Sequence, residues 1–490
     1  MITVWLAIGS SEAADARALT LDEALEQGAA ANGALALSMY ARDQAESSVR
    51  SARGAFDPVY RAELAIEPTR RSRGYAGGFP AEFETQSYAI DQGIGGLLPT
   101  GTSWDASLSL TRNTASTVTR IGGAASENLF DAYAGDLSVS LGQELLRGLR
   151  SRYNLQNVTR ATDALTEAEL AAEKQRQDTR LAVSVAYWDW SYAVAAEQIA
   201  IDAEGVAEEA LRVSQARVLG GDLAPMEGMR LEAALVQAQQ DRVEAQLRAE
   251  AAANALLLLI GYDPSMGVMP ATLPGEVADV PLDPVKVAEV ATAQNLDLAV
   301  ARQRLDAARR QWQIAKDGVL PTLTAVASAG VASQRCLDGT DDPNCVVGGA
   351  GDALLGLLAP DNFPFVSVGG VFEVPLGNRA ARGARDQAAV TVSMRERDLA
   401  DTERAVAGAV EEQLRTLGAS RARVELADTN IRLAEATLSA EQALFDAGRS
   451  ILKNVLEART EVARTRNEAA RARTEYRLAQ SRLLALQGQL

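Results

Sequence analysis

Two cysteines carry the plainest chemistry in this chain. Cys336 and Cys345 enclose residues 337–344, a polar segment rich in Asp, Gly and Pro that is typical of a turn. In an exported protein such a pair is expected to form a disulfide, worth roughly 2 to 3 kcal/mol in the chain-entropy model. Metal binding by the two thiols is the weaker alternative.

The chain of 490 residues contains no histidine. Ser-His-Asp and Cys-His nucleophile systems, HExxH zinc sites and haem ligation by histidine are therefore excluded. The carboxylates are dispersed over predicted helices and form no catalytic dyad. We therefore predict that the protein is not an enzyme and uses no cofactor or catalytic metal.

The formal net charge is −17 and the isoelectric point is near 4.7. Binding to nucleic acid is not expected, because phosphate contacts need a surplus of Lys and Arg. An acidic surface confers solubility and favours cations.

Alternating apolar and polar residues predict β-strands in both halves of the chain. The clearest pattern places Trp104, Ala106, Leu108 and Leu110 on one face and four polar residues on the other. Similar patterns run through residues 60–66, 88–94, 137–141, 323–331 and 366–374. No stretch reaches the ~20 apolar residues that a membrane-spanning helix needs, so any crossing would use strands. A soluble sheet packed on one face would give the same pattern.

Residues 150–219 and 380–447 lack proline and predict helices of about 105 Å. Apolar residues recur every seven positions, which is typical of coiled-coil packing. The rows are Val185, Tyr192, Ile199, Val206 and Val213; Val410, Leu417, Val424, Ile431, Leu438 and Phe445; and Val455, Val462, Ala469, Tyr476, Leu483 and Leu490. Small residues at 458, 465, 472 and 479 predict a close antiparallel hairpin that reverses at Gly448. An isolated structural coiled coil is the alternative.

The carboxyl half repeats the plan of the amino half. Asn32 corresponds to Asn295 at an offset of 263, and Gly221 corresponds to Gly448 at an offset of 227. Two copies indicate internal duplication. The fold class is mainly α with β. We interpret residues 1–16 as a signal peptide remnant. Residues 17–280 form the first repeat, with a helix, a β segment at about 58–146, a long helical hairpin at about 150–261 and a linker. Residues 281–490 form the second repeat, with a helix at about 284–317, a β segment at about 321–376 and a long helical hairpin at about 380–488.

From about Leu19 to Gly488 the sequence resembles the TolC-type outer-membrane efflux protein family. Four segments carry this resemblance: residues 21–25 (LDEAL), 143–148 (QELLRG), 375–378 (PLGN) and 447–458 (AGRSILKNVLEA). The resemblance implies a homotrimer whose strands form one outer-membrane β-barrel and whose long helices form a periplasmic α-barrel. It also implies a periplasmic adaptor protein, an inner-membrane transporter and outer-membrane lipid as partners. Export of drugs or metal ions, or type I secretion, would be the function. A periplasmic coiled-coil tether with a soluble β domain is the alternative.

The resemblance also points to a constriction at the periplasmic helix tips. The matching positions, which follow or flank the two tip glycines, are Glu227, Phe445, Arg449, Ser450, Asn454 and Glu457. Phe445 stands where the family typically has tyrosine, and Ser450 where it has arginine, which puts a tyrosine–arginine bond of the closed state in doubt. Arg449 or Lys453 could substitute, and packing is the expected role of Phe445 because it continues the seven-residue row. Ordinary solvated tip residues are the alternative. An additional hairpin around Pro99 departs from the family pattern. It could lengthen the barrel rim, form an external loop or add strands, and we expect an extension outside a minimal twelve-stranded barrel.

Overall fold

The computed structural model describes residues 17–220, 225–275, 283–337, 345–360 and 362–490, and the chain divides into two compact units. Unit 1 comprises the described parts of 1–43, 166–304 and 396–490. Unit 2 comprises those of 44–165 and 305–395. Both repeats therefore contribute to each unit. The predicted signal segment, 1–16, lies outside the described residues.

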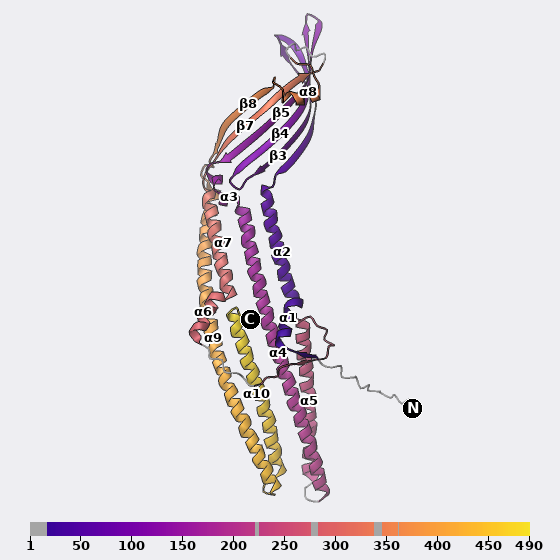
Figure 1. Cartoon of the computed structure of the whole chain (residues 1–490), viewed down its shortest axis with the longest axis vertical. Helices are drawn as coiled ribbons and strands as arrows, with labels where there is room; N and C mark the ends of the chain where they lie inside the picture. The colour runs from indigo at the N-terminus through magenta and orange to yellow at the C-terminus, as the bar shows by residue number, and fades with distance from the viewer. Residues whose placement is uncertain (1–16, 221–224, 276–282, 338–344, 361) are drawn as a thin grey trace, which may run out of the picture. The chain divides into compact units, whose positions relative to one another are not determined.

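Unit 2 contains one antiparallel sheet of six strands in the order β2-β3-β4-β5-β7-β8 (Figure 1). The predicted alternating segments all become strands of this sheet. Their bounds are β2 Val59–Ala76, β3 Phe79–Leu97, β4 Thr102–Ile121, β5 Ala124–Glu144, β7 Thr322–Cys336 and β8 Phe363–Glu373.

The register of the sheet aligns apolar side chains on one face. Tyr60 pairs with Ile94, Ile94 with Ala106, Ala106 with Val139, and Val139 with Ala329. Because opposite residues point to the same side and neighbours along a strand alternate, this row belongs to one apolar face. The helix α8, Ala350–Gly356, packs on the same face, where the carbonyl of Ala353 accepts a hydrogen bond from Ser333.

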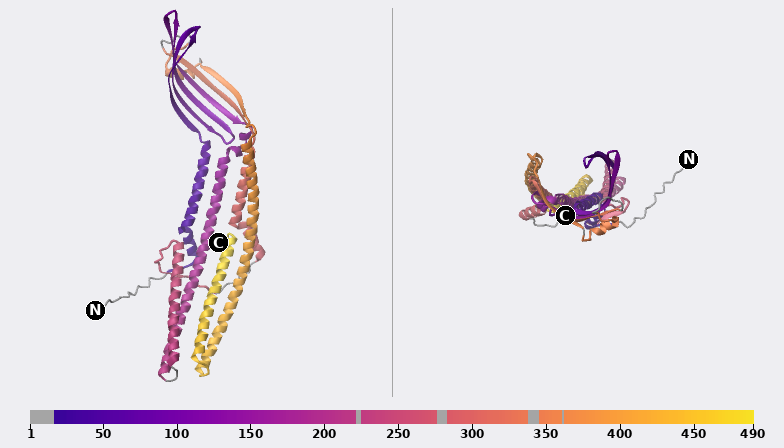
Figure 2. Two further views of the ribbon diagram at one scale, coloured as in Figure 1. Left: turned by 180° about the vertical axis from the view of Figure 1, so that it is seen from behind. Right: turned by 90° about the horizontal axis from the view of Figure 1, so that it is seen from above.

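The sheet is strongly curved, and α8 lies on its convex side (Figure 2). The apolar face is therefore the convex face. The opposite, concave face carries the polar members of each alternating pattern.

The hairpin around Pro99 belongs to the six-stranded sheet, so among the expected alternatives the structure favours added strands over an external loop. β3 and β4, which flank Pro99, pair from Ala81 opposite Thr119 to Leu97 opposite Ser103. Each also pairs with its other neighbour, so the two strands form the second and third of the six. Edge-to-edge backbone hydrogen bonding, which the alternation alone does not reveal, fixes this position.

Long helices lead to and from the strands, and the division between the units falls inside four of them, α2, α4, α7 and α9. No described helix has an apolar stretch long enough to cross a bilayer. The helices are α1 Leu21–Ala31, α2 Gly33–Arg53, α3 Ser151–Asn154, α4 Gln156–Leu219, α5 Pro225–Leu259, α6 Pro284–Gln294, α7 Leu296–Gly318, α9 Arg379–Asp446 and α10 Leu452–Leu486.

Both first helices of the repeats are broken at an asparagine, where the sequence predicted continuous helix. Asn32 separates α1 from α2, and Asn295 separates α6 from α7. Both asparagines have extended backbone, and their side-chain oxygens accept hydrogen bonds from the first backbone N–H groups of the following helix. This N-capping explains why asparagine stands at corresponding positions of the duplication.

Unit 1 contains two hydrophobic clusters. One joins α1, α4 and the end of α5 around the fully buried Tyr187 and Trp190, whose rings meet edge to face at 5.9 Å. A short parallel pair, β1 Arg17–Leu19 with β6 Val268–Pro270, covers this cluster, and Tyr187 donates a hydrogen bond to the carbonyl of Leu19. No alternating pattern in the sequence predicts this pair of strands.

The second cluster of unit 1 is the predicted seam between α9 and α10. Val410, Leu417 and Val424 are buried against Tyr476 and Leu483, as are the small residues at 472 and 479. The seam of the second repeat is therefore confirmed. In the row of the first repeat, Val185, Tyr192 and Ile199 are partly buried, whereas Val206 and Val213 are each 36% exposed.

Candidate functional site

The concave face of the sheet is a polar wall. Ser107 and Ser138 share a hydrogen bond of 2.9 Å between neighbouring strands, and Ser328 and Ser367 share one of 2.7 Å. Arg61 of β2 forms an ion pair with Asp105 of β4 across the intervening strand. Small hydroxyls and charged groups on this wall favour contact with water over protein packing.

Three carboxylates of the concave face lie in one row across the strands. Glu63 is opposite Asp91, Asp91 is opposite Ser109, and Ser109 is opposite Asp136. Within the described part of the chain these three carboxylates have no ion-pair partner. Such a row produces a negative potential that attracts cations.

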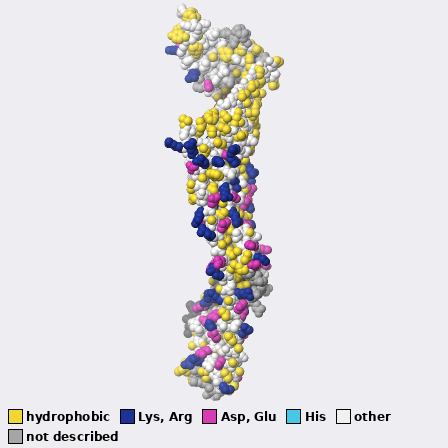
Figure 3. Space-filling model, turned by 90° about the vertical axis from the view of Figure 1, so that its left-hand side faces the viewer, with side chains coloured by type: hydrophobic (Ala, Val, Ile, Leu, Met, Phe, Trp, Pro, Cys, Tyr) yellow, Lys and Arg dark blue, Asp and Glu magenta, His cyan; other side chains and the backbone are white. Residues whose placement is uncertain are grey.

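The convex face leaves large apolar side chains uncovered. Leu64 and Ile66 of β2 are 69% and 62% exposed, and Val366 and Val368 of β8 are 78% and 81% exposed. Figure 3 shows hydrophobic side chains over much of the strand region. An apolar surface of this extent, on which α8 alone packs among the described elements, indicates contact with lipid or another protein.

Arginines gather where the helices meet the sheet, as the dark blue side chains below the strands in Figure 3 show. Residues 147–160 contain four arginines and no carboxylate, although the whole chain is strongly acidic. Arg53, Arg379 and Arg382 are exposed, and their side chains make no hydrogen bond or ion pair with described residues. Guanidinium groups beside an apolar band match the phosphates of lipid headgroups.

One carboxylate is buried at this junction. The side chain of Asp317 is 2% exposed and forms ion pairs with Arg150, at 2.8 Å, and with Arg152. The hydrogen bond from Arg152 lowers the pKa of Asp317, so this carboxylate stays ionised at neutral pH. The contact joins the helix α7 of the second repeat to the first repeat.

The predicted tip residues of the second repeat gather around the turn from α9 to α10. Gly448 has a positive φ of 70°, which suits glycine in this tight reversal. The Ser450 hydroxyl donates to Glu441 at 2.7 Å, and the Asn454 amide donates to Ser450 at 3.2 Å. Sequence reasoning missed Glu441, because it lies nine residues before Ser450 and only the chain reversal brings them together.

The other predicted tip residues remain predictions as constriction residues. Glu457 pairs with Lys453 at 3.3 Å along the same helix, and Phe445 is partly buried at the end of α9. Arg449 is exposed and has no side-chain partner among the described residues. The side chain of Glu227 lies outside the described residues.

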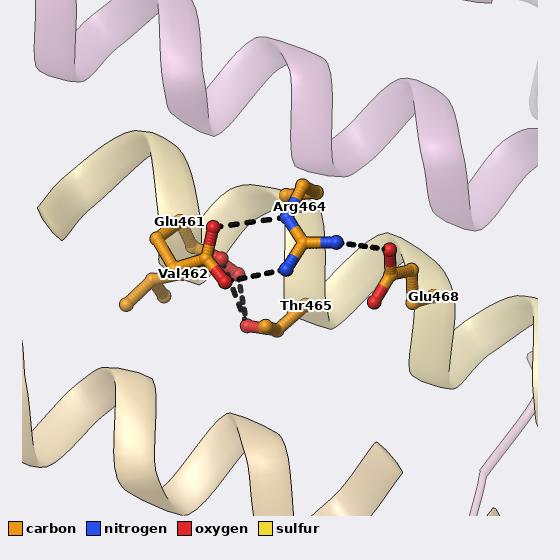
Figure 4. A network of polar contacts seen from close by, with 5 residues as sticks. All are labelled: Glu461, Val462, Arg464, Thr465 and Glu468. Atoms are coloured by element: carbon orange, nitrogen blue, oxygen red, sulfur yellow. Dashed lines mark hydrogen bonds and ion pairs between the residues drawn. The ribbon is translucent and has the colours of Figure 1, made fainter. Parts of the chain in front are cut away.

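Farther along α10, Arg464 binds both Glu461 and Glu468 on the exposed face of the helix (Figure 4). The hydrogen bonds to Glu461 raise the pKa of the Arg464 guanidinium. This network has the same chemistry as the Lys453–Glu457 pair but lies outside the turn, which makes it a useful control.

The disulfide predicted between Cys336 and Cys345 is present, with 5.8 Å between the Cα atoms. It closes the segment after β7, and because both sulfur atoms are used in this bond, neither cysteine is a free thiol.

Residues 287–489 match the family model for "Outer membrane efflux protein". The fold is similar to that of VceC from Vibrio cholerae, with 16% identity, a TM-score of 0.61 and 96% of each chain covered. It is also similar to the CmeC channel of Campylobacter jejuni, with 15% identity, a TM-score of 0.63, and 96% of this chain and 86% of that one covered. The open state of the MtrE channel of Neisseria gonorrhoeae is also similar, with 15% identity, a TM-score of 0.60, and 96% of this chain and 88% of that one covered. No curated protein sequence matches this chain.

The long helices and the antiparallel sheet therefore have the fold of these solved outer-membrane proteins. Over residues 287–489, most of the second repeat, the chain is similar to the family described as "Outer membrane efflux protein".

Proposed function

We propose that three copies of this chain assemble into an export channel whose strands close one β-barrel in the outer membrane and whose helices form a periplasmic tunnel. The observation that carries the proposal is the two-faced sheet, with an uncovered apolar convex face and a polar concave face. Among the described strands, β2 and β8 are the open edges of the sheet, and each is bonded to one neighbour. In lipid, such edges must be paired, and closure with other copies pairs them all.

The helices of unit 1 also present apolar rows that no part of the described chain covers. Met229, Val236 and Val243 on α5 are spaced by seven residues and are 63%, 50% and 46% exposed. Leu426 and Leu433 on α9 are likewise seven apart and are 66% and 61% exposed. Rows with this period fit a coiled-coil seam with α-helices of another copy.

Cargo would enter from a periplasmic adaptor and an inner-membrane transporter and would leave through the barrel. The class of cargo remains open between drugs, metal ions and secreted proteins. A structural tether with a soluble β domain would need a cover for the convex face, and only α8 packs there among the described elements.

The assembly is tested by purifying the protein in detergent, measuring its mass and recording single-channel currents in planar bilayers. We expect a trimer with discrete, stable conductance. A monomer that stays soluble without detergent would contradict the proposal.

The tip residues are tested in the same bilayers with Glu457→Gln. We expect a changed conductance and weaker block by divalent cations, because three carboxylates would be lost from the tunnel entrance in a trimer. The matched control is Glu468→Gln, which removes a similarly paired carboxylate from the same helix. Equal conductance and equal block in the two variants would place Glu457 on the solvated surface.

A further inference from the structure

The two repeats contribute unequal numbers of strands to the sheet. The first repeat supplies β2, β3, β4 and β5, and the second supplies only β7 and β8. Both hairpins of the first repeat turn on two glycines, Gly77-Gly78 and Gly122-Gly123. All four glycines have positive φ, as two-residue hairpin turns of type I′ require. The first repeat thus contains two hairpins with the same two-glycine turn, whereas the second repeat contains a single pair of strands.

The inner strands β3 and β4 form part of the wall. They continue the apolar row of the convex face through Ile94 and Ala106, and β3 supplies Asp91 to the acidic row of the concave face. Both edges of each strand are fully used in pairing. A hairpin outside the barrel would have no reason to preserve either row.

We propose that the barrel of this protein has eighteen strands, six from each of three chains, and that β3 and β4 widen its bore. This inference rests on the trimer proposed above. With strands about 4.8 Å apart and tilted by about 40°, eighteen strands close at a diameter of about 36 Å between backbones, and twelve at about 24 Å.

The difference decides what fits through the strand section. Side chains occupy about 5 Å of each wall, which leaves a bore of about 26 Å for eighteen strands and about 14 Å for twelve. A single α-helix with its side chains is about 10–12 Å wide. The wider bore passes a polypeptide with paired helices side by side, whereas the narrower one passes a single helix at most.

The two glycine turns allow a clean test by excision. Deleting residues 79–123 joins Gly78 to Ala124 and keeps the Gly77-Gly78 turn between β2 and β5. In the excised chain Ala76 is opposite Ala124, because the same two glycines form the turn. When β2 keeps its irregularity between Glu67 and Arg70, this register places Tyr60 opposite Val139. These two residues already share the apolar face, so the excised sheet of four strands keeps its orientation.

The barrel diameter is measured by electron microscopy of trimers in lipid nanodiscs, after the mass has shown three chains. We expect about 36 Å for the full chain and about 24 Å for the excised variant. The control removes residues 72–75 together with 80–83, which shortens one hairpin tip by four residue pairs without changing the number of strands. This control should keep the full diameter. A full-length trimer with a barrel of about 24 Å would overturn the inference, whereas particles that are not trimers would overturn the proposed assembly.

A cysteine test needs no excision. Tyr60→Cys combined with Val139→Cys places two thiols three strand spacings apart, about 14 Å, which is too far for a disulfide. Ile94→Cys combined with Ala106→Cys places them directly opposite each other. In the full-length trimer only the second pair should form a disulfide, and the native cysteines do not interfere because they are bonded to each other. A disulfide between positions 60 and 139 would show that β3 and β4 lie outside the wall.

Discussion

The two repeats share one plan but bury their long hairpins differently. In the second repeat, α9 and α10 close a continuous seam within the chain, with Val410, Leu417 and Val424 against the small residues of α10. In the first repeat, α4 and α5 are held around Tyr187 and Trp190, while apolar rows farther along stay exposed.

The two long hairpins therefore differ in how much of their apolar surface is covered within the chain. The second hairpin buries one face within the chain, where Val287 and Leu298 of α6 and α7 join its cluster, and α9 still leaves apolar side chains exposed. The first hairpin makes contacts with α10, where Tyr192 donates to Asn467 at 3.2 Å and Gln177 donates to the carbonyl of Ala485 at 2.7 Å. Its outer helix α5 is left with apolar surface for a neighbouring molecule.

The largest effect is expected from charges placed on that outer surface. Val236→Asp combined with Val243→Asp should abolish the trimer, because six carboxylates would have to be desolvated at the seams between copies. Mass measurement in detergent gives the oligomeric state. Ala234→Asp, on the same helix and also exposed, is the control and should remain a trimer. Intact trimers in the double variant would remove α5 from the interface.

The aromatic cluster of the first repeat should be the next most sensitive position. Trp190→Ala removes a side chain that is 1% exposed and should destabilise the protein by about 3–5 kcal/mol, since a large cavity replaces it. The control is Trp312→Ala on α7, whose side chain is 36% exposed. Thermal unfolding should show a much larger drop in melting temperature for position 190. Equal drops would mean that the cluster does not hold α4 to α1.

The ion pairs of Asp317 link the two repeats and should depend on pH. Their contribution is present at neutral pH, because the pKa of Asp317 is lowered by Arg152, and it is lost as the pH falls below about 4 and through the folded-state pKa. Asp317→Asn should destabilise the protein by about 3 kcal/mol at pH 7, since it leaves two arginines without their carboxylate. The gap in melting temperature between wild type and variant should close on acidification. A gap that stays constant down to pH 3 would contradict this ionic role.

Local pattern was sufficient to predict the strands and the second seam. The alternation at Trp104–Leu110 and the seven-residue row at Val410, Leu417 and Val424 reflect burial that the chain satisfies by itself. The Val206 and Val213 row has the same period but stays exposed within the chain. A periodic pattern shows that a face will be covered without showing which molecule covers it.

Long-range pairing was the part that the sequence did not predict. The place of the Pro99 hairpin in the sheet depends on backbone hydrogen bonds between strands, and these follow from turn geometry at four glycines rather than from alternation. The Glu441–Ser450 bond at the tip depends on the chain reversal in the same way. The helix breaks at the two asparagines could have been predicted from the sequence, because an Asn before a run of helix-forming residues is a capping signal.

The smallest effects should come from those two asparagines, which give the most closely matched comparison of the repeats. Asn295 is 5% exposed, caps α7 through two backbone N–H groups and also donates to the carbonyl of Leu486 at 3.1 Å. Asn32 is less buried, and its side chain accepts one hydrogen bond, from Leu35. Asn295→Ala should therefore cost about 2 kcal/mol and Asn32→Ala about 1 kcal/mol, the excess reflecting the buried carbonyl left without its donor. Asn295→Asp tests this excess, because aspartate can cap the helix but cannot donate to Leu486. If its melting temperature equals that of wild type, the cap alone accounts for Asn295 and the two repeats are equivalent at this position.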